Sequence, residues 1–216
     1  MRVFAATTAL FDGVAVEGWE KSLPSDKRLE IGRMRREQDR ALTLTAYRLL
    51  CFGLKVAYDI VPKETDWRRT PQGKPYLAGH APCFNLSHSG DVVICALHET
   101  CVGADVEKVR PIEDSLAQRV MSGQEYTMFL AAQDQADFFF RVWTMKEAYI
   151  KYVGEGLRKD MKSFEAYPLE GRIQTSVTDC EFTLLDGFPG YRAAICADEL
   201  AAEPVVWVSK MQLDRV

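Results

Sequence analysis

The sequence contains no hydrophobic run long enough to cross a membrane, and its charge is close to balanced. No apolar stretch reaches the ~18 residues that a membrane-spanning helix needs, so we expect a protein without membrane segments. The formal net charge of −4 argues against nucleic-acid binding through a basic surface. With 47% hydrophobic and 27% charged residues, the composition is that of an ordinary soluble globular protein.

The cysteine patterns of zinc sites and disulfide-rich domains are also absent. The six cysteines include no Cys-x-x-Cys pair, and most of them lie in apolar stretches. This arrangement is typical of buried free thiols in a reducing compartment. The first twenty residues have only a short apolar run that soon becomes acidic, unlike a secretory signal. We therefore expect a cytoplasmic protein, and we expect it to be a monomer.

The most informative stretch is residues 138–156, which we expect to form one helix that ends at a glycine. On it, Glu147 and Lys151 lie one turn apart on the same face as Trp143. The pair could be a surface ion pair worth only ~0.3–0.5 kcal/mol, or it could belong to a site. Apolar residues repeat at helical spacing along the stretch: Phe140, Trp143, Ile150 and Val153.

A second acidic group lies at the end of a predicted strand at residues 102–106. Asp105 and Glu107 are two residues apart, so an extended chain points both side chains to one side. Neighbouring carboxylates repel, which raises the pKa of one of them unless a cation lies between them. If the helix brings Glu147 to the pair, three carboxylates form a site suited to Mg²⁺. The alternative is an acidic strand end in solvent.

These residues resemble the signature of the 4'-phosphopantetheinyl transferase superfamily, in its larger, Sfp-type branch. The separation of Asp105 and Glu147 is similar to that of the family, and the motifs follow the same order. One departure is Tyr152, where the family usually has a small residue. The matching segments are Gly73–Pro75 (GKP), Phe84–Gly90 (FNLSHSG), Gly103–Glu107 (GADVE) and Trp143–Lys151 (WTMKEAYIK).

The resemblance implies an α+β fold of two pseudo-symmetric α+β halves with the active site between them. We expect the halves at residues 1–102 and 103–216. A faint internal repeat points the same way, because Ile94-Cys95-Ala96 recurs as Ile195-Cys196-Ala197, and Ala46-Tyr47 recurs as Ala148-Tyr149. Strands are predicted at residues 2–10, 84–86, 92–97, 102–106, 164–169, 172–177, 180–185, 191–197 and 204–211.

Basic residues in the first half are candidates for phosphate binding. Residues 27–53 are predicted to be mainly helical with a local excess of positive charge. This is typical either of a solvated helix or of a phosphate-binding face. A turn at residues 87–91 would carry Ser87 and His88, and a histidine in a turn is often only polar surface. In view of the resemblance, the candidates for contacts with coenzyme A are Lys27, Arg40, Lys74, Ser87, His88 and Lys151.

The resemblance implies transfer of 4'-phosphopantetheine from coenzyme A to a serine of an acyl- or peptidyl-carrier protein, leaving adenosine 3',5'-bisphosphate. Such carriers serve fatty-acid, polyketide or nonribosomal peptide biosynthesis. Asp105, Glu107 and Glu147 would bind Mg²⁺ or Mn²⁺. Glu147 is the first candidate for the catalytic base and Glu107 the second, and Lys151 would neutralise the attacked phosphate. Two other classes stay open: a metal-dependent phosphohydrolase, and a non-catalytic module that binds coenzyme A or a carrier.

Overall fold

A computed structural model describes residues 1–9, 19–79, 82–154, 159–200 and 203–216, which belong to two compact units. Unit 1 comprises residues 1–100 and 202–216, and unit 2 comprises residues 101–201. Both mix helices with antiparallel strands, which confirms the expected α+β class. Within the described ranges, no helix is both long and apolar enough to cross a membrane.

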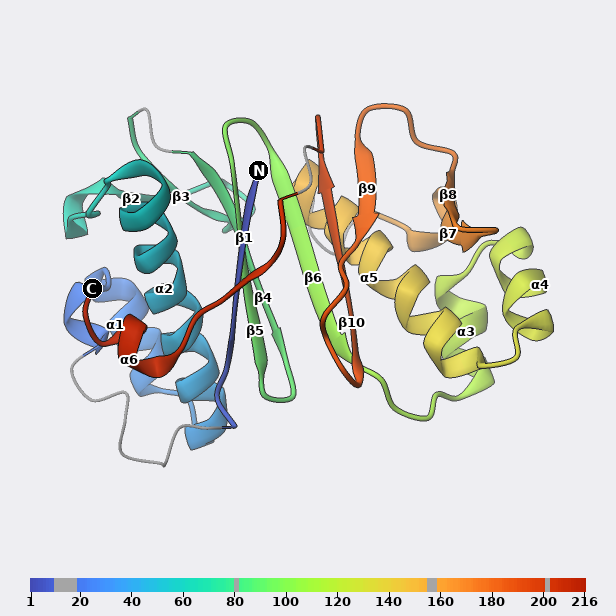
Figure 1. Ribbon diagram of the computed structural model, residues 1–216, viewed down its shortest axis with the longest axis horizontal. Coiled ribbons are helices and arrows are strands. Elements are labelled where there is room, and N and C mark those ends of the chain that lie inside the picture. Colours follow the sequence, from blue (N-terminus) through green and yellow to red (C-terminus); the bar gives the residue numbers. More distant parts are fainter. Residues whose placement is uncertain (10–18, 80–81, 155–158, 201–202) are drawn as a thin grey trace. The chain divides into compact units, whose positions relative to one another are not determined.

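Unit 1 is built on a four-stranded sheet in the order β11-β1-β5-β4. Figure 1 labels three of these strands, β1, β4 and β5. Strand β1 (Arg2–Thr7) is antiparallel to β5 (Val92–His98) and parallel to β11 (Val206–Trp207). Strand β4 (Cys83–Ser89) pairs with the other edge of β5. The long helix α2 (Glu37–Tyr58) packs on β5, β4 and β1. The remaining elements are η1 (Trp19–Ser22), α1 (Ser25–Gly32), η2 (Glu64–Asp66), β2 (Trp67–Arg69), β3 (Pro75–Leu77) and α6 (Lys210–Leu213).

The basic region predicted to be mainly helical over residues 27–53 is helical in two segments. Helix α1 ends at Gly32, and Arg36 has an extended backbone (φ −95°, ψ 127°) before α2 begins. A glycine followed by an extended residue interrupts the hydrogen-bond ladder, although the apolar pattern continues. Helix α2 then runs beyond residue 53 to Tyr58, where Asp59 takes the left-handed conformation that ends it.

The predicted turn at residues 87–91 is shorter in the structure, and Ser87 and His88 are not in it. Both residues lie within β4, where they pair with Ile94 and Val93 of β5. Only Gly90 and Asp91 connect the strands, and Gly90 has a φ of 58°. Glycine at the first position suffices for a two-residue hairpin loop, so the ladder continues to Ser89.

The strand predicted at residues 204–211 is also a correction. Strand β11 has two residues, and the chain then forms α6, which starts at a capping box between Ser209 and Gln212. The Arg48 Nε atom donates to the Leu213 carbonyl, and Trp19 Nε1 donates to Asp214. Because of these contacts, the last residues group with unit 1 rather than with the second half of the chain.

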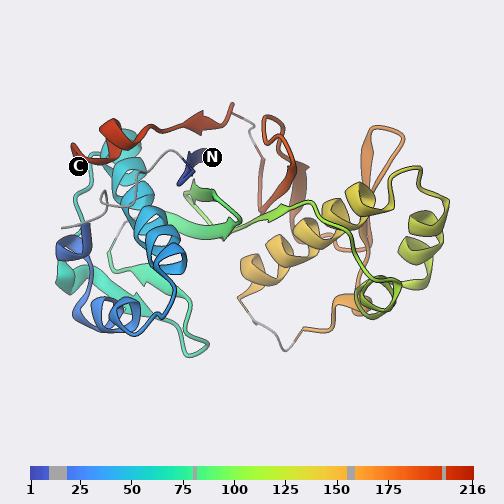
Figure 2. The same ribbon diagram turned by 90° about the horizontal axis from the view of Figure 1, so that it is seen from below.

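Unit 2 has a three-stranded sheet in the order β6-β10-β9. Strand β10 (Tyr191–Ala197) lies between β6 (Val102–Lys108) and β9 (Glu181–Leu184), and all pairings are antiparallel. Helix α5 (Gln135–Val153) packs along β6 and β10, as its course beside the strands in Figure 2 indicates. The other elements are α3 (Asp114–Val120), α4 (Gly123–Ala131), η4 (Met161–Ser163), β7 (Ala166–Leu169) and β8 (Arg172–Thr175).

The central helix of unit 2 has clear signals at its start and end. The Asp134 side chain accepts from the Asp137 backbone N–H at 2.9 Å, which caps the first turn of α5. The helix therefore begins before residue 138, and it ends at Gly154, whose φ is 79°. The second predicted stop, Gly156, lies outside the described residues. The predicted start of α4 is confirmed, because Ser122 and Glu125 form a capping box there.

The two units share one topology. Each runs from a strand through helices, the last of them long, to a two-stranded hairpin and two further strands. In each unit the second of the two strands after the hairpin lies between the first strand and the strand before it, as in β1-β5-β4 and β6-β10-β9, and unit 1 adds β11 beside β1. The repeated tripeptide lies on β5 and β10, and the repeated Ala-Tyr pair lies on α2 and α5. The internal repeat therefore falls on corresponding elements.

Candidate active site

The candidate acidic residues lie on two neighbouring elements of unit 2. Strand β6 carries Asp105 and Glu107, and α5, which packs on it, carries Glu147. Gly103 allows this close approach, because a Cβ atom there would overlap the Ala148 carbonyl oxygen of α5. A residue with any side chain would push the strand from the helix. The glycine of the motif thus sets how near the two acidic elements come.

Lys151 of α5 contacts Asp105 on strand β6. Its Nζ atom lies 2.7 Å from Asp105 Oδ1 and 3.1 Å from the Ala104 carbonyl oxygen. The Asp105 side chain is only 6% exposed, so this is a largely desolvated ion pair rather than a solvent-exposed one. Glu107 is more accessible and contacts Arg110 Nη1 at 3.3 Å.

Glu147 lies in the electrostatic field of these groups. Its partial burial raises the pKa of its carboxyl group. The Asp105 carboxylate raises that pKa further, Lys151 lowers it, and Glu107 raises it again. A carboxylate with a raised pKa is a stronger proton acceptor than one in free solution. The sequence pattern indicated this crowding, and the structure assigns Glu147 the raised pKa.

The carboxylates of Asp105, Glu107 and Glu147 are chemically suited to a divalent cation, but their side chains are not positioned around one. Across the described ranges, no three His, Cys, Asp or Glu side chains are arranged to hold a metal. Instead, cations of the chain contact the carboxylates, with Lys151 at Asp105 and Arg110 at Glu107. The three oxygen donors are nevertheless of the kind Mg²⁺ prefers. Because Asp105 and Glu107 raise the pKa of Glu147, a shared cation would relieve their repulsion.

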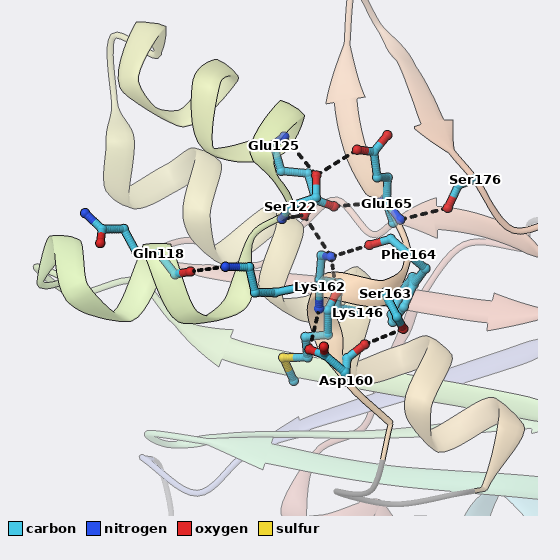
Figure 3. Close-up of polar contacts among 12 residues, drawn as sticks. Gln118, Ser122, Glu125, Lys146, Asp160, Lys162, Ser163, Phe164, Glu165 and Ser176 are labelled. Carbon is cyan, nitrogen blue, oxygen red and sulfur yellow. Dashed lines mark hydrogen bonds and ion pairs between the residues drawn. The ribbon is translucent and has the colours of Figure 1, made fainter.

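A fully buried ion pair lies next to Glu147 in sequence and was not predicted. Lys146 of α5 points to Glu125 of α4, with 2.8 Å between Nζ and Oε2 and no exposure of either side chain (Figure 3). Lys146 Nζ also donates to the carbonyl oxygens of Met161 at 2.5 Å and Phe164 at 2.6 Å. All three ammonium protons can therefore be used, as a buried charge requires.

Glu125 is equally well bonded. One carboxylate oxygen accepts from the Ser122 backbone N–H, and the other accepts from the Ala166 backbone N–H, each at 2.8 Å. The cluster thus joins the start of α4, the middle of α5 and the segment that leads into β7 (Figure 3). With Lys146 held on one side of α5, the next residue, Glu147, is directed to another side of the helix. The capping box was the only sequence signal for this cluster, and it did not identify Lys146 as the partner.

A cavity of about 310 Å³ lies in unit 1, at some of the residues predicted to bind phosphate. Lys27, Lys74 and His88 line it, together with the aromatic side chain of Tyr47. Lys27 is largely enclosed, whereas His88 on β4 is exposed. An acidic residue that was not predicted, Glu30, lines the same cavity.

The other two predicted residues of unit 1 lie elsewhere. Arg40, on the first turns of α2, is not among the lining residues of this cavity, and its guanidinium lies 4.0 Å from Glu37. The Ser87 side chain is buried within β4 and is likewise not among the lining residues. The cavity therefore brings together three of the five candidates in this unit.

Comparison with known proteins gives matches over most of the chain. A family model described as the 4'-phosphopantetheinyl transferase superfamily matches residues 101–196. A second, described as 4'-phosphopantetheinyl transferase, N-terminal, matches residues 16–100. The two matches meet at residues 100 and 101, where unit 1 gives way to unit 2.

Individual relatives match over about four fifths of their length. The 4'-phosphopantetheinyl transferase Sfp of Bacillus subtilis is 32% identical over 180 residues, which cover 80% of each chain. The 4'-phosphopantetheinyl transferase psf-1 of Bacillus pumilus is 32% identical over 186 residues, covering 82% of this chain and 79% of that protein. The crystal structure of Thermotoga maritima holo-[acyl-carrier-protein] synthase covers 45% of this chain and 61% of that chain. Its TM-score of 0.40 and identity of 23% are too low to support a conclusion.

Proposed function

The chain belongs to the 4'-phosphopantetheinyl transferase superfamily, and from this we propose that it moves 4'-phosphopantetheine from coenzyme A to a serine of an acyl- or peptidyl-carrier protein. The observation that carries the proposal is the position of Glu147. Glu147 is a half-buried carboxyl group whose pKa is raised by burial and by the carboxylates of Asp105 and Glu107, and lowered by Lys151. Activation of a weak hydroxyl nucleophile beside a charged phosphate calls for such a combination.

In the proposed reaction, the serine oxygen forms a bond to the phosphorus of the phosphopantetheine group. The bond from that phosphorus to the bridging oxygen of the pyrophosphate breaks, and adenosine 3',5'-bisphosphate leaves with the electron pair. The serine proton passes to the Glu147 carboxylate, and Glu107 is the second candidate for this role. Lys151, which contacts Asp105 at 2.7 Å, would neutralise charge on the attacked phosphate.

We propose that Asp105, Glu107 and Glu147 hold Mg²⁺, with Mn²⁺ as a substitute. The carboxylate set and the mutual effect on the pKa of Glu147 support this assignment. When bound, such a cation would neutralise charge on the pyrophosphate and on the departing oxygen. Lys151 would then be released from Asp105 to contact the substrate phosphate.

For unit 1 we propose a role in binding the phosphates of the adenosine end of coenzyme A. The cavity lined by Lys27, Lys74 and His88 supports this role, since it combines two ammonium groups with an aromatic wall at Tyr47. Arg40 and Ser87 remain candidates from the sequence, at positions outside the lining of this cavity.

The acceptor would be a carrier protein of fatty-acid, polyketide or nonribosomal peptide biosynthesis, modified by a monomeric enzyme in the cytoplasm. Three of the six cysteines, Cys51, Cys95 and Cys196, are buried free thiols, which agrees with a reducing compartment. An acidic carrier would be attracted by basic residues, so added salt should slow its association.

The test is incubation of the protein with coenzyme A, Mg²⁺ and an apo carrier protein, followed by the intact mass of the carrier. We expect the carrier to gain one phosphopantetheine group and adenosine 3',5'-bisphosphate to appear in equal amount. Release of inorganic phosphate with no change in the carrier would indicate a phosphohydrolase instead. Binding without either product would indicate a non-catalytic module.

A further inference from the structure

Glu30 is an acidic side chain in the wall of a cavity proposed to receive phosphates. It lies on α1, three residues after Lys27, and both residues line the cavity of about 310 Å³. Glu30 Oε1 lies 2.7 Å from Lys27 Nζ, which is within hydrogen-bond distance. The lysine proposed to bind a ligand phosphate therefore already has an anion of the chain beside it.

Lys27 has little freedom to leave this contact without another partner. Its side chain is only 11% exposed, and its Nζ atom lies 5.3 Å from the centre of the Tyr47 ring. The Glu30 side chain, in contrast, is 47% exposed and can turn into solvent. If a phosphate enters, the carboxylate is thus the partner that can move, and the ammonium group can exchange one anion for the other.

Glu30 also links a second cation to the cavity wall. Its Oε2 atom lies 3.4 Å from Arg69 Nη2, and Arg69 Nη1 donates to the Gly73 carbonyl oxygen at 3.4 Å. Gly73 directly precedes Lys74, the second lysine of the cavity. The carboxylate therefore offsets positive charge on α1 and at the end of β2, where Arg69 contacts the loop that carries Lys74.

We propose that Glu30 is a resident anion of the cavity, which occupies Lys27 until a phosphate of the ligand displaces it. This rests on the proposed function, in which the cavity of unit 1 receives phosphates of coenzyme A. Because the Glu30 carboxylate competes with a ligand phosphate for Lys27, it weakens the binding of coenzyme A and of the bisphosphate product alike. Since product that binds less tightly leaves faster, Glu30 would favour turnover at the expense of affinity.

The test is the affinity of Glu30→Gln for adenosine 3',5'-bisphosphate, measured by isothermal titration calorimetry on the full chain. The amide keeps the size of the side chain and removes the charge. We expect binding to become about two- to fivefold tighter, the range of a partly exposed ion pair, and the gain to shrink at high salt. Unchanged or weaker binding would overturn the proposal, and weaker binding would mean that Glu30 orients Lys27 instead.

A matched control separates the local effect from net charge. Asp59 of unit 1 is 86% exposed and pairs with Lys55 at 2.5 Å, and it does not line this cavity. Asp59→Asn removes the same charge, and asparagine tolerates the left-handed backbone there. We expect it to leave the affinity unchanged. An equal gain in this control would attribute the effect to net charge and refute the role of Glu30.

A double mutant tests whether Glu30 acts through Lys27. In a Lys27→Met background, Glu30→Gln should tighten binding less than it does in the wild type, because the occupied ammonium is gone. The single variants Lys27→Met and Lys74→Met test the proposed function separately. If both leave the affinity unchanged, the cavity is not the phosphate site. If both weaken binding while Glu30→Gln has no effect, the cavity assignment stands and the resident anion is refuted.

Discussion

At the scale of single residues, Glu147 has the most demanding environment of the proposed catalytic groups. We expect Glu147→Gln to reduce the turnover number for carrier modification by ~10²–10⁴-fold, because an amide cannot accept the serine proton. Weaker binding of the divalent cation would add to this loss. The assay is the rate at which an apo carrier gains mass, at saturating coenzyme A.

Circular dichroism and thermal melting serve as controls for that variant, since glutamine keeps the size and helix propensity of glutamate. A folded variant that retains more than about a tenth of wild-type turnover, a far smaller loss than that expected for a general base, would rule out Glu147 as the catalytic base.

The buried pair of Lys146 and Glu125 leads to a prediction about stability. Lys146→Met leaves the Glu125 carboxylate buried without its cation, so we expect a loss of about 3–5 kcal/mol in the free energy of unfolding. The double variant Glu125→Gln, Lys146→Met should recover a substantial part of this loss, because no charge is then left uncompensated. Urea denaturation measures both effects.

Lys162 provides the comparison for this pair. It is exposed and donates to a single carbonyl oxygen, that of Gln118 at 3.0 Å. Lys162→Met should therefore change stability by no more than about 0.5 kcal/mol. Equal losses in the Lys146 and Lys162 variants would mean that the buried pair contributes nothing special.

The sequence indicated which acidic residues could form a site, but not which side chains they contact. Spacing along the strand placed Asp105 and Glu107 on one side, and the resemblance to the transferase signature added Glu147 to them. The contact of Lys151 with Asp105 depends instead on how closely the helix packs on the strand. The burial of Lys146 depends on a segment that returns after α5, which local periodicity does not contain.

At the scale of elements, the approach of β6 to α5 depends on Gly103. Gly103→Ala would place a methyl group onto the Ala148 carbonyl oxygen and 2.5 Å from the Tyr152 backbone nitrogen. Because neither backbone atom can move without shifting the helix, we expect a loss of about 3 kcal/mol or more in stability. Gly123→Ala at the start of α4, where a methyl group meets nothing within 4 Å, should be tolerated.

Thermal melting of the two alanine variants, with carrier modification as a second measurement, checks this prediction. The Gly103 variant should lose activity even at temperatures where it is folded, since a displaced α5 moves Glu147 away from β6. A Gly103 variant as stable and active as the Gly123 variant would show that the close approach is not required.

The elements that the sequence predicted well are those with strong local signals. The strand at residues 191–197 has the predicted bounds, and the capping box marks the start of α4. One error lies at residues 204–211, where the capping box of Ser209 and Gln212 starts α6 in place of the predicted strand. The turn predicted at residues 87–91 was too long, because the residue pattern alone does not show that Gly90 and Asp91 suffice to connect the two strands.

At the scale of the whole molecule, we expect transfer to depend on the proposed metal, which would balance the charge of the site. Removing divalent cations with EDTA should abolish transfer, and added Mg²⁺ should restore it, because three carboxylates and a pyrophosphate otherwise repel. Circular dichroism should be unchanged, since Lys151 and Arg110 already contact two of the carboxylates. Full turnover in a rigorously metal-free buffer would contradict the assignment.

The shared topology of the two units does not extend to their chemistry. By the repeat of Ala46-Tyr47 and Ala148-Tyr149, Thr45 of α2 corresponds to Glu147, and Leu49 corresponds to Lys151. Both residues of α2 are fully buried, so this position in unit 1 belongs to the core. The repeat in the sequence therefore predicted the duplicated α+β scaffold. It did not predict that positions carrying charged residues on α5 hold buried core residues on α2.

The pairing of β11 with β1 has a consequence for how the protein is made. Unit 2 is a single continuous segment, whereas unit 1 needs residues synthesised both before and after it. On the ribosome, β1 therefore emerges early and keeps one edge unpaired until β11 and α6 follow, which are made only after the residues of unit 2. The unit that begins first is finished last. A nascent chain arrested just after residue 200 would thus carry a complete unit 2 beside a sheet that still lacks its outer strand.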